Sequence, residues 1–346
     1  MKKILLVLVM VGLFGIFLSS DGYALVKPEY VVKIATIAPE MSGWGPVMYK
    51  FRDRVAKETN GRVKILMYWG GVMGDEPDLI RKVRLGQIQG AMVTFTALNR
   101  VVPELAVVDL PFIFNNRDEA AYIVDKFYGK FNDYFEKQNG LLGATFEVGW
   151  WDFYSMKKCT NRDDFRKLTV EGLASDVFVE TFRAWGIPMV AFPPVDFIPS
   201  VQTGVVGAST GPLQYYVGAQ LMTVAPYYLK VHWLYQHGGA MMDKKYFDKM
   251  PEDLRKIVLT AMKDVGSGAT KSTRDSNDKL APNVAKIGII VTEPSPEVVE
   301  DFKTASRPVW DKLAQKKLYT PALLNEILGA IEEYRKTHST KRDYWF

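Results

Sequence analysis

Residues 207–211 read GASTG and fit the pattern G-x-S-x-G, which places a nucleophilic serine on a strained strand-to-helix turn in many hydrolases. Ser209 would be this nucleophile, with His338 as its base and Asp243 or Asp248 orienting the histidine, and these residues follow in an acceptable order. His338, however, lies in the polar tail THSTKRD, an unusual place for a general base. A serine hydrolase is therefore kept as an alternative and not as the main hypothesis.

Other reactive patterns are weaker. His232 and His237 are separated by an odd number of positions, which puts them on opposite faces of a strand, and no cysteine lies near them. The glycine-rich stretch GGVMG at 70–74 lacks the Lys-Ser/Thr pair of a phosphate-binding loop and predicts a turn. The sequence thus predicts neither a metal nor a cofactor, and it favours a binding protein over an enzyme.

A different chemistry is indicated by EVGWWDF at 147–153. The apolar run before it predicts a buried strand, and Trp150 and Trp151 would stand where that strand ends. In open α/β sheets the ligand crevice lies beyond the carboxyl ends of the strands. Two indoles at such a point predict an aromatic surface on which a small molecule could pack.

The elements that must position these residues alternate along the chain. Strands are predicted at 31–38, 62–69, 91–98 and 141–151, with helices at 44–59, 76–85 and 117–137 between them. The rhythm repeats with strands at 168–172, 188–192 and 205–210 and helices at 175–185 and 197–203. This order predicts an α/β fold with two mostly parallel sheets, each flanked by helices.

Three later segments are predicted to complete and connect the two units. The strand at 229–237 is long enough to cross between lobes, and a helical stretch from 252 to about 285 could lie across both. Helices at 296–316 and 321–336 follow.

The N-terminus and the composition restrict the function further. Residues 1–24 combine a basic start, an apolar run and small residues before the expected cut, which is typical of a cleaved secretory signal peptide. No later segment is apolar and long enough to span a bilayer. The net charge of +5 is mild and its basic residues are scattered among acids, so no nucleic-acid partner is predicted. The single cysteine, Cys159, allows no internal disulfide and is expected to be a buried thiol.

Five motifs, in one order, carry a family resemblance. GRVKILMYWGGVMGDEPDLIRKVRLGQIQGAMV, PELAVVDLPFIF, RDDFRKLTVEG, VQTGVVGASTGP and MPEDLRKIV resemble successive landmarks of the solute-binding proteins of tripartite ATP-independent periplasmic (TRAP) transporters. The resemblance covers nearly all of the chain after the signal peptide. It implies a periplasmic receptor with two α/β lobes and a hinge, which closes on a solute and delivers it to a permease driven by an ion gradient.

The resemblance also implies lobe boundaries. The first lobe would comprise 25–148 and 237–276, and the second 149–236 and 277–346.

The family mostly carries organic acids, whose carboxylate is held by an arginine in an I-R-V strand, often with a second arginine in G-x-R and an asparagine in E-N-P. Here Glu171 stands at the first of these positions, Trp151 at the second and Gly211 at the third. Tryptophan offers an apolar face and one N–H donor, and an ionised glutamate offers only acceptors. A ligand carboxylate buried beside Glu171 would therefore be disfavoured by several kcal/mol.

Two ligand hypotheses follow, and a third stays open. The ligand is either neutral and largely apolar, with Glu171 accepting a hydrogen bond or paired with Lys157 or Lys158, or it is a cation held by Glu171 and the indoles. A carboxylate held by another basic residue is the third possibility. The expected ligand-binding residues are Trp44, Thr94, Phe95, Phe112, Trp150, Trp151, Glu171, Ser209, Thr210, Gly211, Gln214 and Tyr215. A carrier or sensor with the same fold but no permease is the other alternative function.

Overall fold

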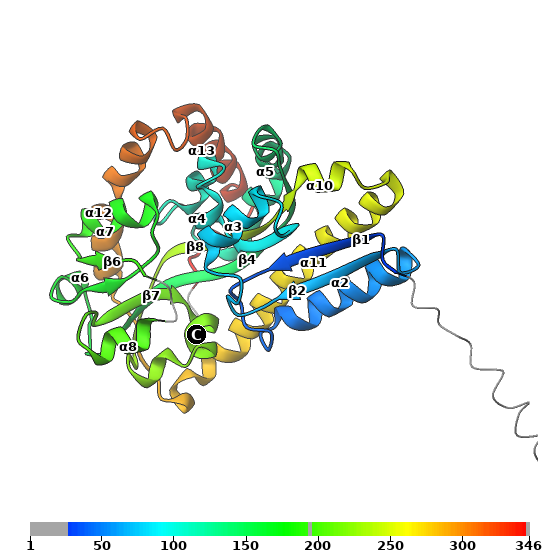
Figure 1. Ribbon diagram of the computed structural model, residues 1–346. Coiled ribbons are helices and arrows are strands. Elements are labelled where there is room, and N and C mark those ends of the chain that lie inside the picture. Colours follow the sequence, from blue (N-terminus) through cyan, green and yellow to red (C-terminus); the bar gives the residue numbers. More distant parts are fainter. Residues whose placement is uncertain (1–26, 193–195, 344–346) are drawn as a thin grey trace, which may run out of the picture.

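The computed structural model describes residues 27–192 and 196–343. In this part of the chain one continuous nine-stranded sheet has the strand order β2-β1-β3-β8-β4-β7-β5-β6, and β9 pairs with β8. Helices flank the sheet, as the α/β fold class requires (Figure 1). The predicted fold class is confirmed, and the sheets of the two lobes are joined because β4 and β8 are long enough to belong to both.

The first half of the chain forms β1 (Tyr30–Ala35), α2 (Trp44–Glu58), β2 (Val63–Tyr68), α3 (Glu76–Arg84), β3 (Gly90–Thr94), α4 (Phe95–Leu98), the 3₁₀ helix η1 (Pro103–Asp109), α5 (Arg117–Lys137) and β4 (Gly140–Ser155). These bounds agree with the predicted elements to within two residues except at three strands. The strand expected at 31–38 ends at Ala35. The strand expected at 91–98 ends at Thr94, because the Thr94 side chain accepts a hydrogen bond from the Ala97 N–H and starts a helical turn. The strand expected to end at Trp151 continues to Ser155.

The second half forms α6 (Arg162–Phe165), β5 (Val170–Glu171), α7 (Asp176–Trp185), β6 (Met189–Val190), α8 (Phe197–Gln202), β7 (Ala208–Pro212), α9 (Leu213–Gly218), η3 (Leu221–Thr223) and β8 (Tyr227–Asp243). It ends with α10 (Lys244–Asp248), α11 (Glu252–Leu280), η4 (Ala281–Ile287), β9 (Ile290–Thr292), α12 (Pro296–Gln315) and α13 (Pro321–Arg335). Ser175 caps α7 as predicted, since its side chain accepts from the Phe178 N–H, and Gly186 closes the helix in the left-handed conformation.

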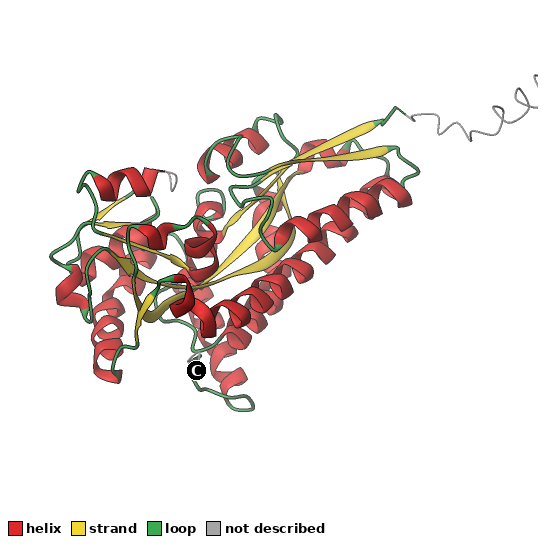
Figure 2. Cartoon of the chain, turned by 90° about the horizontal axis from the view of Figure 1, so that it is seen from below, coloured by secondary structure: helices red, strands yellow, loops and turns green. Residues whose placement is uncertain are grey.

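Apolar side chains form a core on each side of the sheet. One core joins α2 and α11 to β1 and β4 through residues such as Phe51, Val265 and Phe146. Another joins α3, α4 and α5 to the opposite side. Figures 1 and 2 show α11 running along the sheet beside α2 and continuing toward the half that contains β7 and α8. The long helix therefore spans both halves, as its length predicted.

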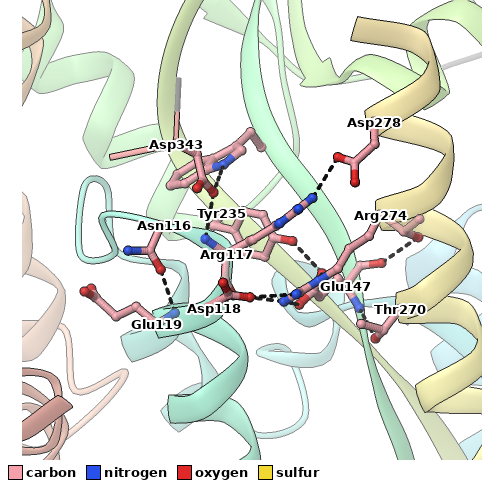
Figure 3. Close-up of polar contacts among 12 residues, drawn as sticks. Asn116, Arg117, Asp118, Glu119, Glu147, Tyr235, Thr270, Arg274, Asp278 and Asp343 are labelled. Atoms are coloured by element: carbon pink, nitrogen blue, oxygen red, sulfur yellow. Dashed lines mark hydrogen bonds and ion pairs between the residues drawn. The ribbon is translucent and has the colours of Figure 1, made fainter. Parts of the chain in front are cut away.

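A buried ion pair lies where α5, β4, β8 and α11 meet (Figure 3). Glu147 on β4 is 2% exposed, and both of its carboxylate oxygens accept from the Arg274 guanidinium, at 2.6 and 2.7 Å. Tyr235 donates to the same carboxylate at 2.6 Å, and Asp118 pairs with Arg274 at 2.6 Å. The network ties these four elements together at the middle of the molecule.

Candidate functional site

A cavity of about 380 Å³ lies at the ends of β1, β3, β5 and β7, with Trp151 of β4 also on its wall. The segment 36–44 after β1 and the helix α9 after β7 cover it from two sides. This volume lies within the range of pockets that hold small organic molecules. The cavity is therefore placed where the strand order predicted a ligand crevice.

Most of the expected residues line this cavity. They are Trp44, Thr94, Trp151, Glu171, Ser209, Thr210, Gly211, Gln214 and Tyr215. They come from segments up to 171 positions apart, from Trp44 at the start of α2 to Tyr215 in α9, and the fold brings them to one surface.

Three expected residues lie elsewhere. Phe95 is fully buried in the core against Phe131, because the turn of α4 rotates it away from the strand end. Phe112 has a left-handed backbone with φ of 59° and lies under the Arg342 guanidinium, 4.9 Å from the ring centre. Trp150 stacks on His232 with ring centres 5.0 Å apart.

The two adjacent indoles point to opposite faces because they stand mid-strand and not at the strand end. Successive side chains of a strand alternate between its two faces, and this alternation places the two indoles on opposite faces once β4 continues to Ser155. Trp150 donates to Asp343 at 3.1 Å on the far side, whereas Trp151 lines the cavity. Only one of the two indoles is thus available to a ligand there.

Trp151 is held by a chain of buried hydrogen bonds. Its indole N–H donates to Gln236 at 2.8 Å, the Gln236 amide donates to Thr96 at 2.7 Å, and the Thr96 hydroxyl donates to Asp109 at 2.7 Å. Burial raises the pKa of the Asp109 carboxyl to about 7. Because the indole N–H is taken by the protein, Trp151 presents an apolar ring to the cavity and no free donor.

The indole N–H of Trp44, which also lines the cavity, is likewise bonded to the protein. Its indole N–H donates to the Thr273 hydroxyl of α11 at 3.2 Å, and its ring packs edge-on against Phe146 at 4.7 Å. Both cavity indoles therefore contribute stacking surface and dispersion contacts to a bound molecule.

Glu171 is 6% exposed and accepts a hydrogen bond from the Ser209 hydroxyl at 2.7 Å. The pairing follows from the sheet, since Glu171 of β5 lies directly beside Ser209 of β7. Burial raises the pKa of Glu171 to about 7, although the bond from Ser209 acts in the opposite direction. The suggested pairing with Lys157 or Lys158 is wrong, because both lysines are exposed and form no contact with Glu171 in the described part of the chain.

The arrangement expected of a serine hydrolase is absent from the described residues. Ser209 contacts the Glu171 carboxyl and no histidine. His338 stacks on Tyr334 with ring centres 4.0 Å apart and is exposed, while Asp243 caps α10. The G-x-S-x-G match therefore forms part of a strand, β7, that supplies wall residues to the cavity.

A second buried carboxyl was missed by the sequence analysis. Glu76, the first residue of α3, is 8% exposed and lines the cavity. Its two oxygens accept from the Thr94 N–H at 2.7 Å and from the Thr94 hydroxyl at 2.6 Å. Burial raises the pKa of Glu76 to about 7. A signal was present, because Glu76 opens a helix directly after the Gly-rich turn at 70–74, at the cleft end of its unit.

The charge of the cavity is the property that most restricts its ligand. Among the described residues that line it, the ionisable acids are Glu76 and Glu171, and none is a lysine, arginine or histidine. At Gly211 a Cβ atom would meet no other atom within 4 Å, so the position adds open space. The described lining thus combines two acids, apolar rings and neutral hydroxyls such as that of Tyr215, and it supplies no cation to pair with a carboxylate.

Residues 34–317 match the sequence profile described as bacterial extracellular solute-binding protein, family 7. The chain belongs to this family. The predicted resemblance to TRAP solute-binding proteins is confirmed, and family 7 proteins bind solutes and are not enzymes.

Related proteins can be aligned with most of this chain. A solute-binding protein of Chromohalobacter salexigens is 24% identical over 83% of this chain and 85% of its own. The C4-dicarboxylate-binding periplasmic protein of Rhodobacter capsulatus is 24% identical over 89% of this chain and 93% of its own. A TRAP periplasmic solute-binding protein of Haemophilus influenzae with bound L-gulonate superposes with a TM-score of 0.82 at 20% identity, covering 88% of this chain and 99% of that one. Another from Sulfurospirillum deleyianum, with bound succinate, has a TM-score of 0.81 at 21% identity over 88% of this chain and 100% of that one.

Family membership makes this a periplasmic solute receptor. The predicted signal peptide lies outside the described residues, and none of the described helices is long and apolar enough to cross a membrane. Cys159 is 4% exposed and burial raises the pKa of its thiol, as expected for a structural cysteine.

Proposed function

We propose that this family 7 protein is an uptake receptor for a small molecule that is not a simple carboxylate, and that it delivers this molecule to a TRAP permease. The observation that carries the proposal is the cavity itself, whose described lining has two buried carboxyls and no basic side chain. The relatives named above hold L-gulonate and succinate, which are acids. The identity of about 20% leaves the ligand of this protein to be argued from its own residues.

A carboxylate would find poor partners here. Its oxygens need donors, yet the N–H groups of Trp44 and Trp151 already donate to Thr273 and Gln236. The negative field of an ionised Glu171 would oppose it at close range. A neutral ligand avoids both penalties by packing on the rings and donating to Glu171.

A cationic ligand is the second candidate, and the same two acids favour it. A protonated amine would lower the pKa of a buried carboxyl beside it and regain part of its lost hydration from the ring faces. Neutral and cationic ligands have in common a donor group directed at a carboxyl and an apolar body against the rings.

The mechanism we propose is closure about the crossings between lobes. The lobe boundaries place these crossings at 148–149 in β4, 236–237 in β8 and 276–277 in α11. Gly149 has φ of 114°, and the pairing of β4 with β8 shifts register between Glu147 and Gly149, which supports a bend there. A ligand that touches both lobes stabilises the closed state by its higher affinity for it.

The C-terminal helix complicates this division. The boundaries give α13 to the second lobe, yet α13 packs on α5, and Arg335 of α13 pairs with Glu119 of α5 at 2.7 Å. A closing motion must therefore carry α13 with the first lobe or break this contact.

Calorimetric titration of L-gulonate, succinate and D-glucuronate into the purified receptor tests the ligand class. We expect no measurable binding of any of the three. Tight binding of one of them, lost in a Glu171→Gln variant or not, would refute the proposal for the ligand while leaving family membership intact. The variant Trp151→Arg/Glu171→Arg should lose the native ligand, and unchanged affinity would place the site elsewhere.

Delivery to a permease needs a separate test, because a carrier or sensor could share the fold. Genes for a small and a large permease subunit beside this one favour transport. Deleting either the receptor or the permease should then abolish uptake of the retained ligand to the same extent. Uptake that persists without the permease would favour the carrier or sensor.

A further inference from the structure

Glu76 and Glu171 reach the cavity from different units of the fold. Glu76 opens α3 and is bonded to Thr94 at the end of β3, whereas Glu171 stands on β5 beside β7. In the sheet, β8, β4 and β7 lie between β3 and β5. The two carboxyls thus enter one cavity from separated parts of the sheet, and the predicted boundaries assign them to different lobes.

Each carboxyl is held in place and keeps acceptor capacity. The Thr94 hydroxyl accepts from the Ala97 N–H, so its own proton points to Glu76, and each Glu76 oxygen receives one bond from Thr94. A carboxylate oxygen can accept two bonds, which leaves one direction open at each. Glu171 receives a single bond, on Oε2 from Ser209, and its Oε1 is not among the fully enclosed polar atoms of the described chain.

Tyr215 connects the two acids across the space. Its hydroxyl has a raised pKa, first because of burial and then because of the negative fields of Glu171 and Glu76. Tyr215 and both carboxyls line the same cavity, so the two acids face a shared volume.

Much of the cavity lining is apolar. Besides the indole of Trp151, the described lining includes Met92, Val93, Leu173 and Val217. A molecule that reaches both acids would contact acceptors at its two ends and could pack its body on these apolar side chains.

We propose that Glu76 and Glu171 bind the two ends of one ligand, so that the receptor selects molecules with a hydrogen-bond donor at each end of an apolar body. Amines and alcohols share this chemistry. The inference rests on the proposed function, since it assumes that the cavity is the ligand site. It adds Glu76 as a specificity-determining residue and gives the ligand two polar ends.

The test uses the full mature receptor and matched straight-chain probes of increasing length. They are the α,ω-diamines, the α,ω-diols, the corresponding monoamines and mono-alcohols, and the α,ω-dicarboxylates. At the best length we expect a diamine or a diol to bind about tenfold or more tightly than its one-ended counterpart, since a hydrogen bond to a charged group contributes about 1.5–3 kcal/mol. Whether the diamine or the diol binds more tightly distinguishes a cationic from a neutral ligand.

Single variants distinguish the two-ended ligand from the proposed function on which it rests. Glu76→Gln and Glu171→Gln should each reduce the advantage of the two-ended probe about tenfold and leave the one-ended probe bound at the other acid. If Glu171→Gln weakens binding and Glu76→Gln does not, the two-ended ligand is refuted and the proposed function stands. If the dicarboxylates bind most tightly, the proposed function itself fails.

An exposed Glu→Gln substitution is the control for general effects of this exchange on folding. Glu332 is exposed on α13, so Glu332→Gln should change neither binding nor the melting temperature. A probe series in which no two-ended compound exceeds its one-ended counterpart, including one in which nothing binds, overturns the inference.

Discussion

Replacing Glu171 by glutamine should stabilise the ligand-free receptor at high pH and change its stability little at low pH. Burial raises the pKa of Glu171 from its ordinary 4.5 to about 7, so the folded protein holds this proton more tightly than the unfolded chain does. Stability is therefore lost as the pH rises from about 4.5 to about 7, and the full loss persists above 7. A carboxyl whose pKa was lowered would show the opposite slope.

The magnitude follows from the same two values. A pKa raised from 4.5 to about 7 corresponds to about 3 kcal/mol, because each tenfold change in proton affinity is worth about 1.4 kcal/mol. By the linkage relation, ionisation of the buried Glu171 lowers the stability of the wild type by about 1 kcal/mol at pH 5 and by nearly the full amount of about 3 kcal/mol at pH 8. The stability of Glu171→Gln relative to wild type should therefore be more favourable at pH 8 than at pH 5 by about 2 to 3 kcal/mol.

Urea unfolding of both proteins at the two pH values measures this difference, with equal m-values as the check that the unfolded states are comparable. Taking the difference between two pH values cancels the constant effect of exchanging an acid for an amide next to Ser209. The exposed Glu332→Gln is the matched control and should show no such pH dependence. Equal effects of Glu171→Gln at both pH values would mean that a cation or water neutralises the site, and the charge argument for the ligand would fail.

Three further outcomes are expected. Arg274→Met should destabilise the fold by about 3 kcal/mol or more in urea unfolding, because the buried Glu147 loses its bidentate partner. Lys271→Met on the same helix removes only an exposed ion pair and should cost less than about 1 kcal/mol. Similar effects of the two variants would show that the ion pair of Glu147 and Arg274 is unimportant for stability. Gly211→Leu should abolish ligand binding with little change in melting temperature, since its side chain enters open space; retained binding would show that the ligand avoids this wall. The exposed Gly329→Ala in α13 should leave binding unchanged and raise the melting temperature slightly, because alanine favours a helix more than glycine does. Cys159 should react with a thiol reagent only on unfolding, because it is buried and its pKa is raised, and fast labelling of the native protein would contradict its placement.

The sequence predicted the architecture well because hydrophobic periodicity and capping residues report local structure directly. The bounds of α5 agree with the prediction at both ends, where Asn116 accepts from the Glu119 N–H as an N-cap. The family motifs then indicated how these elements combine and which positions face the ligand. Three of these positions, Trp151, Glu171 and Gly211, line the cavity.

The errors arose where tertiary structure decides the direction of a side chain. Nothing local shows that β4 runs on past Trp151, so Trp150 was expected in the cavity although alternation turns it to the opposite face. Phe95 was assigned to a strand because the helix cap by Thr94 forms only when the chain turns there. Glu76 was missed because a charged residue at a helix start is usually solvated, and only the packing of Thr94 against it shows that it is buried.

The central claim is that indole faces and acceptors have replaced guanidinium groups in this cavity. The most direct measurement is native mass spectrometry of the receptor purified from its own host, followed by identification of the molecule that it retains. We expect a compound without a carboxylate that carries at least one donor group on an apolar body. A retained simple organic acid would contradict it.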